Sequence, residues 1–252
     1  MIRELRSVAE VRAACGDDDL VVWAAQGLRG GARAWVLGEA VVAACPRVSR
    51  RDRLAVRGGA VHAAELVRHA LAELGPSYRP LGEAALMREV TARLDGLQVA
   101  GRFSWMSLDT DVAGTDGTDG TDGGIGGAGW LEDDDIEQVA ALLAAEAPLS
   151  YAVPGLAGVR RWAGVRAGGE LAAVAADAWS APTVGLLAGV ATRARHRGRG
   201  LAGRVCRWVS RELVAAYGRA ALMVDDDNPA AIRVYERLGY RRRRVAACRA
   251  AG

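Results

Sequence analysis

One basic, glycine-rich stretch in the second half of the chain reads Val190-Ala-Thr-Arg-Ala-Arg-His-Arg-Gly-Arg-Gly-Leu-Ala-Gly203. An apolar segment, Thr183 to Val190, leads into it, and a helical pattern with apolar residues on one face follows it. We therefore expect a strand, a basic turn and the start of a helix. The first N–H groups of a helix lack intrahelical partners, and glycines let an anion approach them. This arrangement predicts a phosphate-binding site.

Two classes of nucleotide-binding protein fit these glycines. The segment Gly198-Arg-Gly-Leu-Ala-Gly203 matches the dinucleotide fingerprint, and Asp225 to Asp227 end the next predicted strand, so an NAD-binding oxidoreductase is one alternative. The basic loop before Gly198 is longer than the tight turn of such a unit, however, and too little chain follows to complete its sheet.

A second motif downstream favours a different family. It reads Asn228-Pro-Ala-Ala-Ile-Arg-Val-Tyr235-Glu-Arg-Leu-Gly-Tyr240 and follows the pattern Arg195-x-x-Gly198-x-Gly200. In this order and at about this spacing, the two motifs resemble the GNAT superfamily of acyl-CoA-dependent N-acyltransferases. The resemblance covers Trp130 to Cys248. It implies an α/β protein with an α+β mixed sheet, with the GNAT fold in the second half and a smaller α/β domain before it.

The resemblance also implies an acetyl-CoA site. The backbones of Ala188, Gly189 and Val190 would pair with the pantetheine, and Asn228 would contact the cofactor. The pyrophosphate would lie on the loop formed by Arg195, His196, Arg197, Gly198, Arg199, Gly200 and Leu201. Arginine side chains at positions 193, 195, 197 and 199 add positive charge for the phosphates.

In the family, a tyrosine of the last helix protonates the departing thiolate, and its position here is Tyr235. A phenol with a pKa near 10 holds its proton at neutral pH and can still donate it to a thiolate whose thiol has a pKa of about 8 to 9. Many members use a strand glutamate as the general base, but Met223 stands at that position. The base is therefore left open among Asp225, Asp226, Glu170 and a relay of water molecules.

These motifs predict an enzyme, an acetyl-CoA-dependent N-acetyltransferase that acts on an amine of a small molecule or a peptide. The alternatives are the NAD-binding oxidoreductase and a CoA-binding regulatory module without catalysis. We expect no metal, no nucleic acid and no membrane as partners, and the sequence gives no support for an oligomer. Arg241 to Arg244 would alternate between the two faces of a strand, which favours a solvated edge or a salt-bridged face over a nucleic-acid site.

Composition narrows the chemistry further. All 33 basic residues are arginine, which excludes a P-loop lysine or a Schiff base. Residues 1–130 carry a net charge of −2 and residues 131–252 a net charge of +5, which favours an anionic ligand in the second half. The four scattered cysteines indicate neither a zinc site nor a disulfide framework, and no signal peptide or membrane span is evident. We therefore expect a cytoplasmic protein.

The chain divides at a linker. Residues 111–129 include three Gly-Thr-Asp triplets and a glycine-rich tail, which predicts a flexible connection. It separates an α/β domain at 1–110 from the GNAT domain at 130–252. The segment Leu54-Ala-Val-Arg-Gly-Gly59, followed by a helix, resembles the later strand and turn without the basic loop. The first domain could therefore be a degenerate GNAT copy that shapes the acceptor pocket.

The remaining pattern predicts the other elements. The apolar run Leu20 to Ala25 reads as a buried strand, after a short helix at residues 3–14. Trp162, Trp179 and Trp208 are expected in the core. Further helices are predicted at 61–74, 83–94, 133–145, 201–217 and 229–238, and further strands at 53–56, 103–108, 159–165, 171–176, 183–190, 220–224 and 240–248. Residues 34–45, interrupted by Gly38 and Glu39, fit a hairpin or a bent strand.

Overall fold

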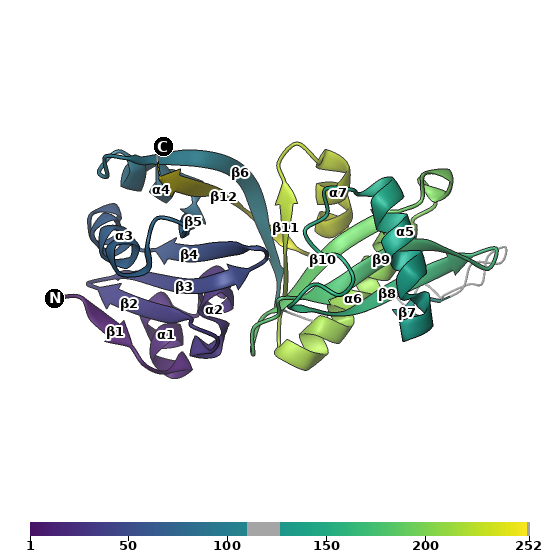
Figure 1. Ribbon diagram of the computed structural model, residues 1–252, viewed down its shortest axis with the longest axis horizontal. Helices are drawn as coiled ribbons and strands as arrows, with labels where there is room; N and C mark the ends of the chain where they lie inside the picture. Colours follow the sequence, from purple (N-terminus) through teal and green to yellow (C-terminus); the bar gives the residue numbers. More distant parts are fainter. Residues whose placement is uncertain (110–126, 251–252) are drawn as a thin grey trace.

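The computed structural model describes residues 1–109 and 127–250. Their strands form one mixed, 12-stranded sheet in the order β1-β2-β3-β4-β5-β12-β6-β11-β10-β9-β8-β7 (Figure 1). The prediction of a mixed α/β protein is confirmed. Most of the predicted linker, 111–129, lies outside the described residues, and its last residue, Gly129, begins strand β7. No helix in the described part of the chain is both long enough and apolar enough to cross a membrane.

The two halves follow the same order of elements. The first half consists of β1 (Arg3–Leu5), α1 (Val8–Cys15), α2 (Asp19–Ala25), β2 (Arg33–Leu37), β3 (Ala40–Val48), β4 (Arg51–Arg57), α3 (Ala60–Leu74), β5 (Arg79–Glu83), α4 (Ala84–Thr91) and β6 (Leu97–Leu108). The second consists of β7 (Gly129–Trp130), α5 (Ile136–Glu146), β8 (Val159–Ala167), β9 (Glu170–Ala178), β10 (Gly185–Thr192), α6 (Leu201–Tyr217), β11 (Ala220–Asp225), α7 (Pro229–Arg237) and β12 (Arg241–Ala250). Among the α-helices and strands, α2 is the one member of the first half without a counterpart in the described residues of the second.

The structure corrects two predictions near the N-terminus. The predicted strand Leu20 to Ala25 is helix α2, which begins where the Asp18 side chain accepts a hydrogen bond from the Val21 N–H. Every residue of that run is buried, so it has no polar face, and periodicity cannot distinguish such a helix from a buried strand. The predicted helix at 3–14 is also wrong in part, because its first residues form the edge strand β1 and helix α1 starts only after Ser7.

The two halves exchange their last strands. Strand β12 ends the second half but lies between β5 and β6 of the first, and β6 in turn pairs with β11 of the second. Four residues face one another in a row across these strands: Glu83, Val245, Phe103 and Asp225. The two outer residues occupy equivalent places, because Glu83 ends β5 just before α4 and Asp225 ends β11 just before α7. In Figure 1 the yellow β12 accordingly runs beside β6, among the elements of the first half. The halves are thus related by an approximate two-fold axis through the pair Phe103–Val245.

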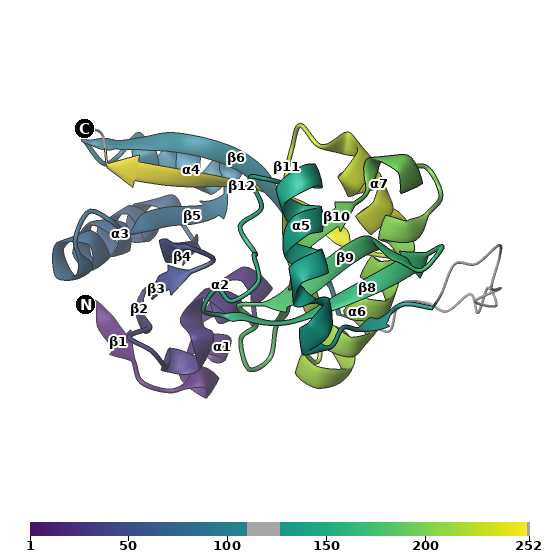
Figure 2. The ribbon, with the colours of Figure 1, turned by 45° about the vertical axis from the view of Figure 1, so that its right-hand side comes forward.

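Helices cover both faces of the sheet. Helices α1, α2 and α5 lie on one face, where a single apolar core extends across both halves. On the opposite face α3 and α4 cover one core and α6 and α7 another (Figure 2). The Trp23 indole joins the halves on the shared side, because it donates to the Trp179 carbonyl at 2.9 Å and its ring lies 5.4 Å from the ring of Trp105. Trp162 and Trp179 are buried as predicted, whereas Trp208 is half-buried.

The arginines of β12 are mostly paired with carboxylates. Arg241 contacts Asp109 at 2.6 Å, Arg242 contacts Asp226 at 2.9 Å, and Arg243 contacts both Asp18 and Asp19. The prediction of a salt-bridged face is confirmed for these three residues.

Substitution in the shared core should destabilise both halves together. Trp105 of β6 is 1 % exposed and packs between elements of the two halves. We expect Trp105→Ala to lower the free energy of unfolding by about 3 to 5 kcal/mol. Urea denaturation followed by circular dichroism and by tryptophan fluorescence should give coincident transitions. Separate transitions for the two halves would contradict the account of the shared core.

Candidate active site

Strands β10 and β11 separate part of the way along their length. They pair in parallel only at Gly185–Ala220, Leu186–Ala221 and Leu187–Leu222. Both strands then continue, to Thr192 and Asp225, without pairing with each other. Residues 188–192 and 223–225 are called here the β10–β11 fork. Backbone groups on the facing edges of this fork are free to bind an extended ligand in the manner of an added strand.

A β-bulge opens the fork. Ala188 and Ala191 face Ala176 and Val174 of β9, so Gly189 and Val190 together oppose a single residue. Gly189 has a φ of +63°, and a Cβ at this position would lie 2.5 Å from the Trp162 ring. Only glycine meets both requirements. A bulge of this kind bends its strand, which carries β10 away from β11.

A loop at residues 193–200, the glycine loop, joins β10 to α6. Gly198 and Gly200 have φ values of +76° and +75°, are exposed, and have open space where a Cβ would stand. The first α6 hydrogen bond runs from the Arg204 N–H to the Gly200 carbonyl at 3.0 Å. Among the described residues, no backbone carbonyl accepts from the N–H groups of residues 198–203. These unpaired donors lie at the positive end of the helix dipole, an arrangement that suits an anionic ligand.

A carboxylate from α5 fixes the beginning of the glycine loop. Glu146, the last residue of α5, accepts the Ala194 N–H at 2.9 Å and contacts the Arg197 guanidinium at 2.7 Å. Arg197 also donates to the Thr192 carbonyl at 3.3 Å. The loop is therefore attached to the helix on the opposite face of the sheet.

A second carboxylate organises the middle of the loop. Glu170 accepts hydrogen bonds from Arg195 and lies 2.5 Å from His196 Nε2. On the other side of the ring, Arg199 lies 3.0 Å from Nδ1. A guanidinium can only donate, so Nδ1 accepts and Nε2 carries the hydrogen toward Glu170. Arg193 also lies 3.7 Å from Glu170. The arginines at 193, 195 and 197, predicted to add charge for phosphates, thus already contact carboxylates.

Two of the candidate bases, Glu170 and Asp226, are carboxylates with a lowered pKa. Hydrogen bonds from Arg195 and then from His196 lower the pKa of Glu170 to about 2. The pKa of Asp226 is also lowered, because hydrogen bonds from Ser104 and Arg242 outweigh the opposing effect of its burial. Asp225 ends β11 and is exposed, and Met223 is half-buried in the fork. Neither Glu170 nor Asp226 suits general-base catalysis at neutral pH.

Tyr235 is a residue of α7, and its side chain lies in the apolar core covered by α6 and α7. Its side chain is 6 % exposed, and its ring centroid lies 6.0 Å from that of Tyr240 in an edge-on arrangement. Burial, with smaller contributions from Cys206 and Tyr240, raises the pKa of Tyr235 well above 10. Its hydroxyl has no hydrogen-bond partner in the part of the chain that the structure describes, whereas the Tyr240 hydroxyl pairs with Ser210 at 2.8 Å. The Tyr235 hydroxyl therefore stays protonated at neutral pH, and no hydrogen bond to another described residue engages that proton.

Asn228 and Leu201, the remaining residues predicted to bind the cofactor, also stabilise the fold. The Asn228 side chain caps α7 by accepting the Ala231 N–H at 3.1 Å, and Asn228 itself is exposed. Leu201 starts α6 with its side chain buried in the core, so only its backbone N–H can face a ligand.

The first half lacks both features of this site. Strands β4 and β5 pair from Arg53–Arg79 through Val56–Gly82, close to the ends of both strands. A Cβ on Gly82 would lie 2.5 Å from the Val56 carbonyl, so the two backbones are in close contact where the second half opens. Helix α3 begins directly after Gly59, without a basic loop. The place between β4 and β5 that corresponds to the β10–β11 fork is therefore closed.

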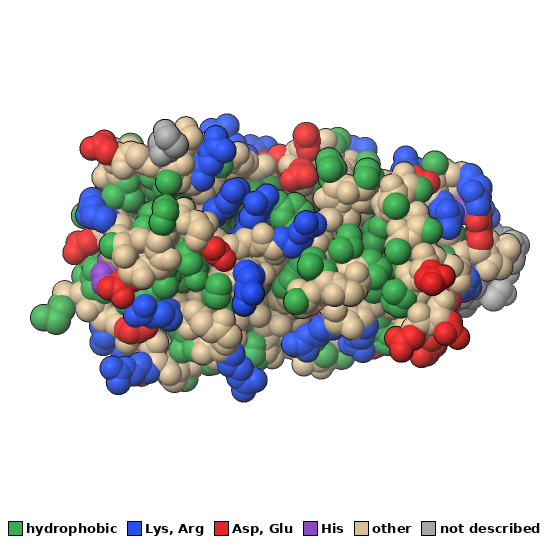
Figure 3. Space-filling model, in the orientation of Figure 1, with side chains coloured by type: hydrophobic (Ala, Val, Ile, Leu, Met, Phe, Trp, Pro, Cys, Tyr) green, Lys and Arg blue, Asp and Glu red, His purple; other side chains and the backbone are tan. Residues whose placement is uncertain are grey.

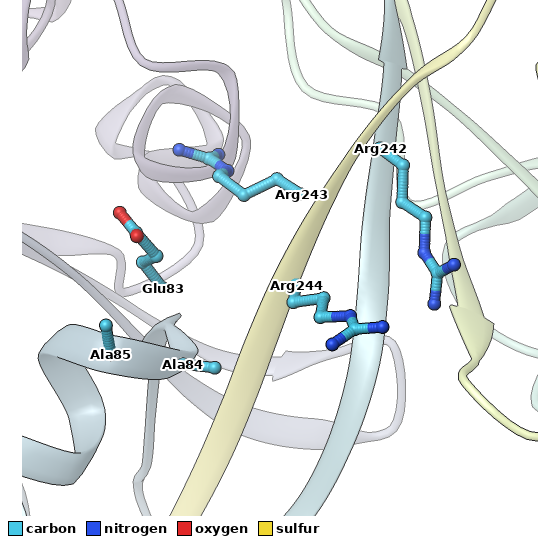
Figure 4. Close-up of a pocket in the computed structure, with 6 residues that line it drawn as sticks. All are labelled: Glu83, Ala84, Ala85, Arg242, Arg243 and Arg244. Carbon is cyan, nitrogen blue, oxygen red and sulfur yellow. The ribbon is translucent and has the colours of Figure 1, made fainter.

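A hollow of about 480 Å³ lies where the two halves meet, lined by Glu83, Ala84, Ala85 and Arg242 to Arg244. Figure 4 shows that Arg243 points away from the side occupied by Arg242 and Arg244. Arg242 and Arg243 are engaged by Asp226, Asp18 and Asp19, as described above. The hollow is thus an open surface feature between α4 and β12, with most of its charge neutralised.

Sequence reasoning missed several residues that shape this site. Glu146 falls at the end of an amphipathic helix, far from the loop in sequence, and no local pattern indicates that it binds the loop. The contact of Trp162 with Gly189 is also invisible in the sequence, although an unpaired glycine inside a strand pattern is a general signal for a bulge or a close approach.

Comparison with known proteins agrees with this geometry. Residues 163–250 match the family model described as FR47-like protein, and no curated protein matches the chain. A solved structure of a GCN5-related N-acetyltransferase from Kribbella flavida is 20% identical with a TM-score of 0.58, covering 93% of this chain and 96% of its own. A GNAT-family protein from Novosphingobium aromaticivorans is 25% identical with a TM-score of 0.52, covering 80% and 88%. An acetyltransferase of the GNAT family from Colwellia psychrerythraea is 11% identical with a TM-score of 0.53, covering 100% of both chains.

The chain therefore has the fold of the GNAT-family acyltransferases, and the predicted resemblance is confirmed. Within that fold, its region 163–250 is similar to FR47-like proteins. The matched structures extend over both halves. The NAD-binding alternative gains no support: β10, α6 and β11 form one parallel crossover, but β10 pairs antiparallel with β9 and β11 pairs antiparallel with β6, whereas a dinucleotide-binding sheet continues in parallel.

The role of Glu170 can be tested through pH dependence. Its pKa is lowered to about 2, so it stays ionised down to strongly acidic pH and cannot produce a titration near neutrality. We expect Glu170→Gln to leave the pH midpoint of kcat/KM for acyl transfer unchanged, with any loss confined to the affinity for CoA. Loss of the ascending limb of the pH–rate profile would instead identify Glu170 as the base.

Proposed function

We propose that this protein is an N-acetyltransferase that moves the acetyl group of acetyl-CoA to an amine. The observation that carries the proposal is the β10–β11 fork, which leads to a row of N–H groups at residues 198–203 that lack backbone acceptors among the described residues. An extended amide-bearing arm that ends in a pyrophosphate matches these two features together. The GNAT fold of the chain supports the same chemistry.

In this proposal, the backbones of Ala188, Gly189 and Val190 bind the pantetheine amides along the free edge of β10. The N–H groups of residues 198–203 bind the pyrophosphate, and Asn228 lies at the start of the neighbouring helix α7. When bound, acetyl-CoA supplies an acyl group activated as a thioester. The residues of the fork hold that group in place, and positioning accounts for much of the rate enhancement in such reactions.

The arginines of the glycine loop take part in two ways. Arg199 contacts the His196 ring and, among the described residues, no carboxylate, so its charge is available to a phosphate. Arg195 and Arg197 are held by Glu170 and Glu146, which position the loop. Because Glu170 and Glu146 already neutralise part of this charge, the backbone N–H groups are expected to provide most of the anion recognition.

Tyr235 is proposed as the general acid. Its hydroxyl stays protonated because burial disfavours the phenolate. A thiolate leaving within the same apolar surroundings is destabilised as well, so the proton can pass from the Tyr235 oxygen to sulfur as the bond breaks. The acceptor would enter as a neutral amine, with Asp225 or a chain of water molecules taking up the proton that the nitrogen releases.

The acceptor class remains that of the sequence prediction, an amine of a small molecule or of a peptide. The engaged carboxylates also favour a second candidate, a CoA-binding regulatory module without catalysis, because neither Glu170 nor Asp226 is a suitable base. Tight CoA binding without acyl transfer to any of a broad panel of amines would support that second candidate.

Replacing Tyr235 should separate catalysis from binding. We expect Tyr235→Phe to lower kcat by about 10²- to 10⁴-fold, the range typical of general acid catalysis. The Kd for CoA, measured by calorimetry, should stay within about twofold, since the hydroxyl makes no ground-state hydrogen bond to lose.

Tyr240→Phe is the matched control. Tyr240 lies in the same core, and its hydroxyl pairs with Ser210 rather than with a reacting group. This variant should lose stability and keep most of its turnover. Equal losses of turnover in both variants, or parallel losses of turnover and CoA affinity in Tyr235→Phe, would overturn the assigned role.

A further inference from the structure

Arg53 of β4 is a buried cation without a partner. Its side chain is only 7 % exposed, and its Nε has no hydrogen-bond acceptor. Within the described residues, no carboxylate lies close enough to form an ion pair with it. Burial lowers the pKa of Arg53 to about 10, which still leaves the guanidinium charged at neutral pH.

The surroundings of Arg53 are basic. Arg79 of β5 is its direct neighbour across the parallel pair, and Arg51 lies two residues earlier on the same face of β4. The Tyr151 hydroxyl accepts a hydrogen bond from Arg51 at 3.4 Å, and the Arg51 guanidinium lies 5.9 Å from the Tyr151 ring centroid. Asp52, the nearest acid in sequence, belongs to the opposite face of the strand and accepts the Arg47 N–H. Figure 3 shows blue arginine side chains along the line where the two halves meet.

Such a residue is costly for the fold. A buried charge is normally paired, because burial removes its hydration and nothing replaces it. An apolar residue of similar volume would serve packing better at this position. The arrangement therefore points to an anion that arrives from outside the chain.

The loop that follows α5 connects this cluster with the fork. Tyr151 contacts Arg51, and the next residue, Ala152, has its Cβ 3.2 Å from the place where a Cβ on Gly189 would stand. Two consecutive residues of this loop thus contact the arginine cluster on one side and the fork on the other. Both lie on the face of the sheet covered by α1, α2 and α5. Tyr151 itself is 44 % exposed, so the cluster can be approached from solvent.

We infer that Arg53, with Arg79, Arg51 and Tyr151, binds an anionic group, a carboxylate or a phosphate, on the amine that receives the acyl group. The inference rests on the proposed acetyltransferase function and narrows its acceptor to amines that carry such an anion. The planar guanidinium of Arg53 can donate two parallel hydrogen bonds to either a carboxylate or a phosphate. In a site shielded from water such hydrogen bonds are strong and oriented. The anion would hold the acceptor while its nitrogen reaches the fork.

Matched acceptors test the inference with the full chain. β-Alanine carries a carboxylate and β-alaninamide does not, and O-phosphoethanolamine and ethanolamine form the corresponding phosphate pair. We expect kcat/KM, measured by release of the CoA thiol, to favour the anionic member of at least one pair by about 10- to 100-fold. The pair that shows the preference identifies the anion as carboxylate or phosphate.

Variants then assign the preference to Arg53. In Arg53→Met the ratio within the preferred pair should fall to about 1, while the Kd for CoA is unchanged. The melting temperature should rise, because an unpaired buried charge has been replaced by an apolar side chain. Arg68→Met, at an exposed position of α3 on the other face of the sheet, is the control and should keep both the ratio and the melting temperature. A ratio that survives in Arg53→Met, or no preference for anionic acceptors in the unaltered protein, would overturn the inference.

A binding measurement separates this inference from the proposed function. Succinate and inorganic phosphate, titrated calorimetrically into the unaltered protein and into Arg53→Met, report the anion site without any acyl transfer. If no amine is acetylated but one of these anions binds in an Arg53-dependent manner, the acetyltransferase proposal fails and the anion site stands. If acyl transfer proceeds but neither anion shows Arg53-dependent binding, the anion site is wrong and the enzyme proposal stands.

Discussion

The pairing of β6 with β12 is the interaction on which the rest of the molecule depends. Each strand belongs in chain order to one half, yet each pairs with a strand of the other. Three strand pairs, β5–β12, β12–β6 and β6–β11, therefore join the halves by hydrogen bonds, and the shared apolar core beneath α1, α2 and α5 extends over the same boundary. Neither half can bury its last strand alone, so the two halves fold as one unit and present one continuous face to ligands.

The two halves differ at equivalent parallel strand pairs, β10–β11 in the second half and β4–β5 in the first. In the second half a bulge at Gly189 and the inserted glycine loop separate β10 from β11 and present a row of free N–H groups. In the first half β4 and β5 stay paired, and Gly82 lies against the Val56 carbonyl. The same order of elements thus gives an open fork in one half and close packing in the other. The first half contributes instead through the face that it shares with the fork, where Arg53 and its neighbours lie.

Local chemistry explains which parts could be predicted from the sequence. Asn228 followed by Pro229 starts a helix through capping and a fixed φ, and glycines at 198 and 200 take the positive φ that the loop requires. The hairpins, the helices α3, α5, α6 and α7 and the identity of the fold follow from such signals. The strand exchange, the attachment of the loop by Glu146 and Glu170, and the isolation of Arg53 depend on contacts between distant segments. The sequence pattern predicts a strand at α2 because the residues Leu20 to Ala25 are all apolar and buried, so no polar face reveals the helical period.

The central claim is that the fork of the second half, and not its closed counterpart in the first, binds the acyl donor. Calorimetric titration with CoA, combined with amide hydrogen exchange of the same complex, tests it most directly. The account predicts one CoA per chain, with protection confined to the fork (residues 188–192 and 223–225), the glycine loop (193–200) and the start of α6 (201–203). Two CoA molecules per chain, or protection at residues 53–62 instead, would contradict it.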